Sequence, residues 1–360
     1  MCTKYKIVYV ISSLRRTGPV NVLYNLICNM DKDIYDVTIV TLKDTESVSD
    51  IERFEMLDVT IISLHMNFAE TIYKGEKKLG KILFGIKPDI VHSQCFRSTL
   101  LLAIINGTWK TCATIHCYPH KDFIYEYGIM LGNVMARLYI NALRNIDLPI
   151  ACSKSISNEL MTKYSLRTLA VCNGVEKQKS KEIDFSLYKN NSKQLVFVCV
   201  SCFNKRKNQE GLLLSAKKLL ETNKIAIIFL GDGKYREKCE NLKIANTYYL
   251  GNVENVGDYY AVADGIISAS KAEGLPMAVI EALMMGVPRY IISDIPPHRE
   301  IEEMFPDLIK IVNYNNELNE NDIDNDAEVY DRKEIMKLAS ERISAKIMAR
   351  KYMKIYDGVK

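Results

Sequence analysis

Short apolar segments alternate with helical patterns along most of this chain of 360 residues. Six apolar runs in the first half are predicted strands: Ile7–Ile11, Val37–Thr41, Val59–Ile62, Ile90–His92, Thr111–Ile115 and Pro149–Cys152. Five more follow in the second half: Val196–Val200, Ala226–Leu230, Tyr248–Leu250, Gly265–Ser268 and Arg289–Ile292. The helical patterns between them include Val20–Met30, Gln209–Glu221 and Tyr235–Leu242. This alternation is typical of parallel sheets that carry helices on both faces, so it predicts an α/β protein.

The chain is long for one domain and comfortable for two, and 48% hydrophobic residues suffice for two full cores. The segment 176–193 is rich in Lys, Ser and Asn and is the predicted linker. We therefore expect Rossmann-like domains at 1–175 and 194–335, and a C-terminal helix at 336–360 that crosses back to the first domain. Ligands of such sheets bind beyond the carboxyl ends of the strands, so two facing domains would form a cleft.

Composition excludes several functional classes. A net charge of +4 is too small to favour a nucleic-acid binder. No run reaches the roughly 18 apolar residues of a membrane-spanning helix. The start, Met1–Lys6, lacks the long apolar region of a signal peptide, so we expect a cytoplasmic protein with reduced thiols.

The segment that carries most chemistry runs from Glu273 to Glu281. Pro276 suits the first position of a helix over Met277–Met285, because a missing N–H costs nothing there. The backbone N–H groups around Leu275 would then point out of a helix N-terminus, which is an anion site suited to a diphosphate. On spacing alone, a helix with an exposed acid near each end is an equally good interpretation.

The same segment resembles the E-x7-E motif of retaining glycosyltransferases of family 4, which have the GT-B fold. Four other segments are similar to this family and follow in its order: Val171–Val175, Ile228–Gly233, Leu250–Val253 and Asp258–Asp264. The resemblance covers most of the chain and is to the bacterial surface-polysaccharide type. It implies two Rossmann-like domains that face each other across a cleft.

The resemblance also implies roles for individual residues. Glu273 would accept a hydrogen bond from a hydroxyl of the donor sugar, and Glu281 from the ribose hydroxyls. His116 would bond the transferred sugar near its 6-hydroxyl, and Lys207 would neutralise the departing diphosphate. The remaining predicted donor contacts are Gly18, Arg206, Gly231, Gly233, Val253, Gly274, Leu275 and Pro276. No metal or other cofactor is expected, since Lys207 and the helix end supply the neutralising charge.

The chain departs from the family pattern at two positions. Where the family usually has an arginine early in the loop after the first strand of the second domain, this chain has Cys202. Arg206 or Lys205 could send its cation into the same space. Where the family often has two glycines after the first strand, this chain has Gly18-Pro19, so Gly18 alone allows close approach.

The sequence gives less information about the acceptor side. Lys121–Leu143 is rich in apolar residues, and Lys74–Lys87 is rich in lysines. A core helix and a solvated helix face are the simpler interpretations of these stretches. Together they support a hypothesis of peripheral contact with the inner face of the cell membrane, which would suit a lipid-linked saccharide acceptor.

The predicted function is a retaining, metal-independent glycosyltransferase. It would move a sugar from a UDP- or GDP-linked donor to a saccharide or lipid-linked saccharide, in surface polysaccharide synthesis. Two alternatives stay open at this point. One is a sugar-nucleotide epimerase or hydrolase of the same fold. The other is a catalytically silent partner subunit, which is consistent with Cys202 at the position of the family arginine.

Overall fold

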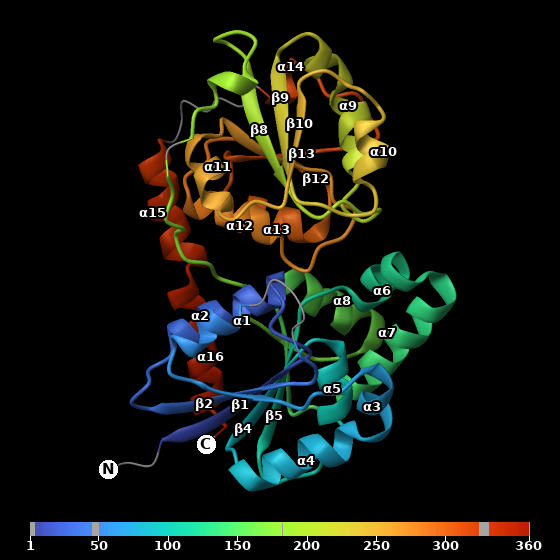
Figure 1. Ribbon diagram of the computed structural model, residues 1–360, viewed down its shortest axis with the longest axis vertical. Coiled ribbons are helices and arrows are strands. Elements are labelled where there is room, and N and C mark those ends of the chain that lie inside the picture. The colour runs from blue at the N-terminus through green and yellow to red at the C-terminus, as the bar shows by residue number, and fades with distance from the viewer. Residues whose placement is uncertain (1–3, 45–49, 182, 324–330, 360) are drawn as a thin grey trace. The chain divides into compact units, whose positions relative to one another are not determined.

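The computed structural model describes residues 4–44, 50–181, 183–323 and 331–359. The chain forms two compact units (Figure 1). Unit 1 comprises Met1–Gly174 together with Ala345–Lys360, and unit 2 comprises Val175–Ser344. Each unit has a sheet and a core of its own and is described by itself.

Unit 1 contains a sheet of seven strands. Its strands are β1 (Tyr5–Ile11), β2 (Tyr35–Thr41), β3 (Thr60–Ser63), β4 (Ile90–Gln94), β5 (Lys110–Ile115), β6 (Leu148–Ala151) and β7 (Leu169–Ala170). Its helices are α1 (Gly18–Cys28), α2 (Ile51–Glu55), α3 (Phe68–Tyr73), α4 (Gly75–Ile86), α5 (Phe96–Leu102), α6 (Pro119–Tyr127), α7 (Ile129–Arg144), α8 (Lys154–Tyr164) and α16 (Ala345–Asp357). The strand order is β3-β2-β1-β4-β5-β6-β7, and all neighbouring strands are parallel.

Unit 2 contains a sheet of six strands. They are β8 (Leu195–Val200), β9 (Ile225–Leu230), β10 (Thr247–Gly251), β11 (Gly265–Ser268), β12 (Tyr290–Ser293) and β13 (Ile309–Val312). Its helices are α9 (Gln209–Glu221), α10 (Arg236–Glu240), α11 (Val256–Val262), α12 (Met277–Met284), α13 (Pro296–Met304), α14 (Glu320–Ile323) and α15 (Arg332–Ile343), with a 3-10 turn at Ser186–Tyr188. The order is β10-β9-β8-β11-β12-β13, again with parallel neighbours.

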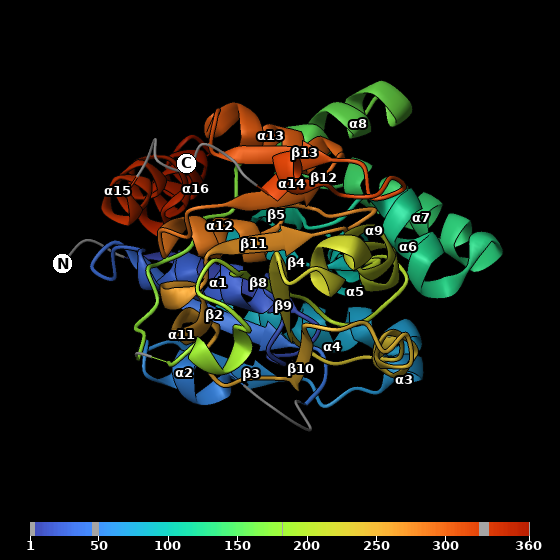
Figure 2. The ribbon, with the colours of Figure 1, turned by 90° about the horizontal axis from the view of Figure 1, so that it is seen from above.

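Both faces of the unit 2 sheet are buried, as a parallel sheet with crossover helices requires. Phe197 and Cys199 of β8 lie in one core together with α9, while the alternate residues Val196 and Val198 are buried on the opposite face. Figure 2 shows α9 on one side of this sheet and α11 and α12 on the other. The strand order reverses between β8 and β11, so the carboxyl ends of these two strands form the ligand-binding switch point of the sheet.

The predicted fold class is confirmed: each unit is a Rossmann-like layer of parallel strands with helices. All eleven predicted strands are present, with ends that differ by at most two residues. The prediction missed two edge strands, β7 and β13. Helix α1 begins two residues earlier than expected, at Gly18, and α10 is shorter than expected, while α9 has the predicted bounds.

The segment expected to be a linker packs on unit 2. The Lys181 N–H donates to Asp258 Oδ1 at 2.6 Å, and Lys189 Nζ lies 2.9 Å from Asp264 Oδ2. Phe185 is only 6% exposed. These contacts attach the segment to α11 and to the end of the loop before β11. The described residues of the segment 176–193, which we expected to link the two domains, therefore belong to unit 2.

The predicted C-terminal helix consists of two helices. Ser344 is extended (φ −70°, ψ 152°) and ends α15, and α16 begins at Ala345. Val175 pairs with Ser344, and its N–H donates to the Ile343 carbonyl at 3.1 Å. Helix α16 belongs to unit 1, where it packs along α1 (Figure 1). The part of the expected helix before Ala345 belongs to unit 2 instead.

Two glycines of unit 2 are required by the close approach of two loops. Gly231 (φ +132°) and Gly233 (φ +154°) follow β9. A Cβ at Gly231 would lie 2.3 Å from the Ser201 carbonyl oxygen, and one at Gly233 would lie 2.3 Å from the Phe203 carbonyl oxygen. The Phe203 N–H donates to the Asp232 carbonyl at 2.9 Å, so the two loops are bonded together. These glycines thus hold the loop after β8 in place.

Gly231→Ala should therefore destabilise unit 2 by about 3 kcal/mol, because both the backbone conformation and the contact with Ser201 oppose a side chain. Gly85→Ala in α4 is the matched control, since Gly85 is exposed and nothing lies within 4 Å of an added Cβ. That change should stabilise the helix by up to about 1 kcal/mol. Thermal unfolding of both variants measures the contrast, and an unchanged midpoint for Gly231→Ala would contradict the packing argument.

Candidate active site

The loop after β8 carries two cations into the switch point of unit 2. Phe203 anchors this loop in the core with 1% of its surface exposed. The Asn204 side chain accepts from the Lys207 N–H at 2.9 Å and closes a turn. Helix α9 then begins after Asn208, which has the left-handed conformation (φ 56°). The turn places Arg206 and Lys207 side by side at the carboxyl end of β8.

The loop after β11 brings Glu273 to the same place. The Lys271 N–H donates to the Arg206 carbonyl at 2.8 Å, which joins the two loops. Glu273 is only 6% exposed. Its Oε1 accepts from Lys207 Nζ and, at 2.7 Å, from Ser270 Oγ, while its Oε2 lies 3.1 Å from Arg206 Nη1. The predicted residues Glu273, Lys207 and Arg206 therefore form one cluster, in which two partly buried cations surround a buried carboxylate.

The charges of the cluster decide its protonation state. Burial alone would raise the pKa of Glu273, but the charges of Lys207 and Arg206 and the hydrogen bonds from Lys207 and Ser270 lower it to about 2. Glu273 is therefore a carboxylate at neutral pH and has no proton to donate. Two cations around one anion leave a net charge of +1 in a partly desolvated site, which favours the binding of an anion.

The two cations are held differently. Arg206 Nη1 also donates to the Ala272 carbonyl at 2.6 Å, so it is tied to the backbone beside Glu273. Cys202, which stands at the position of the family arginine, is exposed, and Asn204 Nδ2 lies 3.1 Å from its sulfur. Arg206 thus brings a second cation to Glu273, while position 202 itself presents a thiol.

Helix α12 begins directly after this cluster. Pro276 (φ −75°, ψ 87°) is the cap before the helix, and Met277 is the first helical residue, so the expectation that Pro276 takes the first helical position was wrong by one residue. Gly274 and Leu275 are buried in front of it. Among the described residues, the N–H groups of Leu275 and Ala278 have no hydrogen-bond partner. These two donors at the start of α12 are available to an anion.

Glu281 lies in the second turn of α12 and is partly buried. Its carboxyl group makes no hydrogen bond or ion pair with the described part of the chain. Because burial penalises the charged form and no cation compensates, the pKa of Glu281 is raised to about 7. The two acids of the E-x7-E motif therefore have opposite environments.

The other predicted donor contacts of unit 2 lie in neighbouring loops. Gly231 and Gly233 follow β9 and face the loop that carries Lys207. Val253 lies half-buried between β10 and α11. The loops after β8, β9 and β10 all follow the carboxyl ends of parallel strands, where ligands of such sheets bind.

Two predicted residues belong to unit 1. Gly18 is the first residue of α1 and has no positive φ, so the left-handed freedom of glycine is not used there. Arg16, in the same loop, pairs with the buried Asp50 at 3.1 Å instead of standing open to a ligand. His116 follows β5, and its Nε2 lies 2.8 Å from Gln94 Oε1. Burial lowers the pKa of His116 to about 4, so its imidazole is neutral.

The sequence prediction missed three polar residues that support Glu273. Ser270 donates to it directly, and Ser293 Oγ donates to the Ser270 carbonyl at 2.5 Å. The fully buried His298 donates from Nδ1 to the Ser293 carbonyl at 2.8 Å, and burial lowers the pKa of His298 to about 4. Ser270 stands three residues before Glu273 and could have been found by its spacing, whereas Ser293 and His298 come from the next strand and helix.

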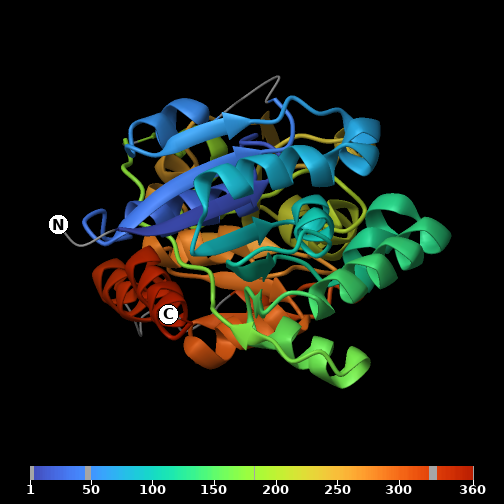
Figure 3. The same ribbon diagram turned by 90° about the horizontal axis from the view of Figure 1, so that it is seen from below.

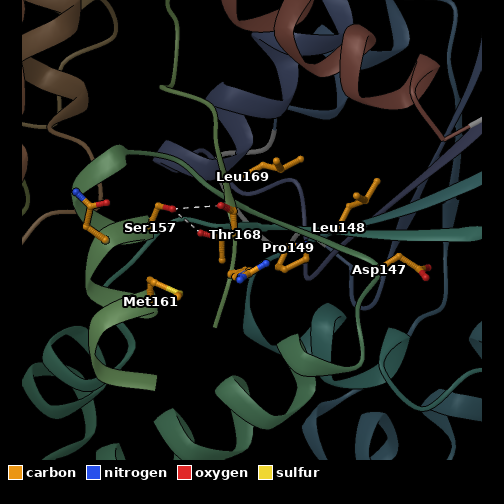
Figure 4. A pocket seen from close by; sticks show the side chains of 9 residues that line it. Asp147, Leu148, Pro149, Ser157, Met161, Thr168 and Leu169 are labelled. Atoms are coloured by element: carbon orange, nitrogen blue, oxygen red, sulfur yellow. Dashed lines mark hydrogen bonds between the residues drawn. The ribbon is translucent and has the colours of Figure 1, made fainter. Parts of the chain in front are cut away.

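A separate pocket of about 490 Å³ lies in unit 1 and is lined by residues that include Pro149, Ser157 and Leu169 (Figure 4). Ser157 and Thr168 are bonded to each other there, with 2.8 Å between their oxygens. The lining comes from the amino ends of β6 and β7 and from α8. Because parallel sheets bind ligands at the opposite, carboxyl ends, this pocket is not the candidate active site.

The described residues contain no group of three or more His, Cys, Asp or Glu side chains that could hold a metal ion. In the cluster, the only carboxylate is already bonded to Lys207, Arg206 and Ser270. The donor set of this site therefore suits an anionic ligand better than a cation.

Comparison with known proteins agrees with this geometry. Residues 16–179 match the model of Glycosyltransferase Family 4, and residues 180–323 match that of Glycosyl transferases group 1. The chain belongs to this family of glycosyltransferases. The O-antigen biosynthesis glycosyltransferase WclY of Escherichia coli is 23% identical, with 98% of each chain covered.

Two further relatives extend the comparison. The alpha-monoglucosyldiacylglycerol synthase of Streptococcus pneumoniae is 24% identical over 76% of this chain and 67% of its own length. The structure of Anabaena Alr3699/HepE in complex with UDP and glucose has a TM-score of 0.74 at 14% identity, with 98% of this chain and all of that chain covered. This likeness shows that the fold is shared.

Donor binding should become tighter as the pH rises from 6 to 8. With a pKa of about 7, Glu281 is mostly protonated at the lower pH and mostly ionised at the higher one, and the carboxylate accepts from two hydroxyls more strongly than the neutral acid does. We expect about a tenfold increase in affinity for a nucleotide sugar, measured by calorimetry, and a flat profile for Glu281→Gln. An intact nucleotide sugar is the right probe because the free diphosphate itself titrates near pH 6. A pH-dependent profile that survives in Glu281→Gln would contradict the assignment.

Proposed function

We propose that this glycosyltransferase transfers a sugar from a nucleotide diphosphate to a saccharide acceptor with retention of configuration and without a metal ion, in the synthesis of a surface polysaccharide. The observation that carries the proposal is the cluster of Lys207, Arg206 and Glu273 at the β8/β11 switch point, beside the start of α12. The similarity to WclY, named as an O-antigen biosynthesis enzyme, supports the polysaccharide context.

The cluster suits stabilisation of a departing diphosphate. Lys207 and the open N–H groups of α12 would receive the phosphate oxygens, and negative charge that grows on them would be neutralised without a bound cation. Glu273 holds Lys207 in place before the donor arrives. Because Glu273 is fully ionised, it would accept a hydrogen bond from a sugar hydroxyl rather than act as an acid. The protein thus positions the donor and stabilises charge. The bond from the sugar to the phosphate would break as the bond to the acceptor oxygen forms, and an oxygen of the departing phosphate would take the proton of the acceptor hydroxyl.

Other residues would contact the nucleotide and the sugar of the donor. Glu281 on α12 has a carboxyl group that makes no hydrogen bond or ion pair within the described residues, and it would accept from the ribose hydroxyls. Val253 and the glycines Gly231 and Gly233 would lie along the nucleotide. The donor is UDP- or GDP-linked, and the UDP complexes of the structurally similar HepE support the uridine class. His116 of unit 1 would bond the transferred sugar.

The acceptor side of unit 1 supports contact with a membrane surface. Helices α6 and α7 form a hairpin that extends from the sheet of this unit (Figures 1 and 3). Gly132 lets the two helices approach closely, since a Cβ there would lie 2.6 Å from the Phe123 carbonyl oxygen. On α7, Met130, Val134 and Leu138 recur at helical spacing and are 87%, 52% and 50% exposed. Such an exposed apolar stripe fits the headgroup region of a bilayer.

The charge of helix α4 and one similar protein also support contact with a membrane surface. Helix α4 presents Lys77 and Lys81 to solvent beside the exposed Phe84. Cations next to apolar side chains favour anionic lipid. One relative is named as a synthase of a glycosylated diacylglycerol, so a lipid-linked acceptor is within the chemistry of similar proteins. None of the helices in the described part of the chain has the length and apolar character that a bilayer crossing needs. The proposed location is the cytoplasmic face of the membrane.

Lys207→Ala should lower kcat about a hundredfold, because it removes a cation that neutralises the leaving group. Lys205→Ala is the matched control: Lys205 is exposed on the same loop and makes no ion pair within the described residues. Turnover is measured with the nucleotide sugar that most stabilises the protein in a thermal-shift panel. Equal kcat values for the two variants would contradict the proposed role of the cluster in neutralising the leaving group.

Vesicle binding should depend on the stripe of α7. The wild-type chain should float with vesicles of anionic lipid at low salt, and replacement of Met130 and Val134 by Ser should reduce the bound fraction several-fold. Met161→Ser on α8 is the control, since Met161 is also exposed (46%) but lies outside the hairpin. Wild-type protein that stays in the soluble fraction would remove the membrane proposal and leave the glycosyl transfer untouched.

A further inference from the structure

A chain of buried polar groups crosses unit 1 beneath His116. Tyr9 and Tyr356 share a hydrogen bond of 3.0 Å between their hydroxyls. His92 Nδ1 lies 2.7 Å from the Tyr356 hydroxyl, and its Nε2 lies 2.8 Å from Thr114 Oγ1. Tyr352 joins at Thr114 with 3.0 Å between the oxygens. All five side chains are at most 1% exposed, so each polar atom here depends on its neighbours.

Gln94 connects this chain to His116. Its Nε2 donates to Thr114 Oγ1 at 3.5 Å, and its Oε1 lies 2.8 Å from His116 Nε2. Gln94 itself is 1% exposed at the end of β4. In this orientation of the Gln94 carboxamide, the oxygen that faces His116 is a carbonyl and only accepts, so His116 carries its proton on Nε2. The Nδ1 atom of His116 is then left with a lone pair and can only accept.

The tautomer matters because His116 is neutral. A neutral imidazole has one donor and one acceptor, and the partner of one nitrogen decides which role the other has. If Nδ1 faces a sugar hydroxyl, the Nε2–H form accepts from it, and the other form would present a hydrogen to the same position. A residue that selects between the forms therefore sets what His116 can bind.

We propose that Gln94 is a positioning residue that holds His116 as the Nε2–H tautomer, and that α16 fixes Gln94 through Tyr352 and Thr114. The proposal rests on the proposed function, in which His116 bonds the donor sugar. It assigns a role to the C-terminal helix, since Tyr352 and Tyr356 are contributed by α16. The sugar must then offer a hydroxyl donor to His116 Nδ1.

The test combines spectroscopy with kinetics on the full-length protein. Two-bond ¹⁵N–¹H correlation spectra report which imidazole nitrogen carries the proton, and loss of a signal in His116→Asn assigns it among the five histidines. We expect the Nε2–H form in the wild type and a mixture of both forms in Gln94→Leu. Gln94→Leu should also lower kcat about tenfold, as expected for one misdirected hydrogen bond, with little change in the KM for the donor.

A double-mutant cycle separates positioning from general structural damage. In a His116→Ala background, Gln94→Leu should have no further effect on kcat, because the group that it orients is gone. Ser93→Ala is the matched control: Ser93 is buried next to Gln94 and bonds Thr99 Oγ1 at 2.9 Å, outside the chain. It should leave both the tautomer and kcat as in the wild type. Tyr352→Phe should shift the tautomer in the same direction as Gln94→Leu.

Several results would overturn the proposal. They are an Nδ1–H form in the wild type, an unchanged tautomer in Gln94→Leu, or full additivity in the cycle. The wild-type spectrum tests the proposal even if Gln94→Leu does not fold. Full activity of His116→Ala would instead contradict the contact between His116 and the sugar in the proposed function. That failure can be told apart from a failure of the tautomer proposal, because the tautomer is measured without substrate.

Discussion

The ion cluster around the buried Glu273 is the interaction on which the candidate site depends. A carboxylate that is 6% exposed is costly unless it is paired, and here two cations and a serine satisfy it. The cluster also joins the loops after β8 and β11, which are distant in sequence. Its stability therefore requires both loops to be in register, and the glycines after β9 secure one of them. A site of this kind is formed by folding and needs little rearrangement to receive an anion.

The two glutamates of the motif show how environment sets chemistry. Glu273 and Glu281 have the same side chain, and both are associated with one short helix. Cations lower the pKa of Glu273 to about 2, and uncompensated burial raises the pKa of Glu281 to about 7. The first is a permanent charge that positions Lys207. The second can change its protonation state near neutral pH. The strength of its hydrogen bonds to a ligand should therefore depend on pH.

Much of the fold and part of the site could be predicted from the sequence. The alternation of apolar runs and helical patterns identified eleven of the thirteen strands, because buried strands of parallel sheets are nearly continuous in apolar residues. The two missed strands are at sheet edges, and β7 is only two residues long and exposed. Glu273, Lys207 and Arg206 were predicted from the resemblance of their segments to the family motifs, not from spacing alone. Ser293, His298 and Gln94 were not, because their relevance arises from side-chain contacts with Ser270 and His116 in loops of neighbouring strands, made directly or through Ser293, and local patterns do not record these contacts.

The division at Gly174 and Ser344 has a consequence for biosynthesis. Unit 2 is continuous in sequence, whereas unit 1 includes both ends of the chain. Residues 175–344 are synthesised as one continuous block, and the sheet of unit 1, which is made before them, still lacks α16 when this block is complete. Tyr352 and Tyr356 are synthesised after all of unit 2, so His92 and Thr114 lack these two partners until α16 has been made. Domains generally fold as units during synthesis, from the N-terminus onward, whereas unit 1 is complete only when α16 follows the whole of unit 2.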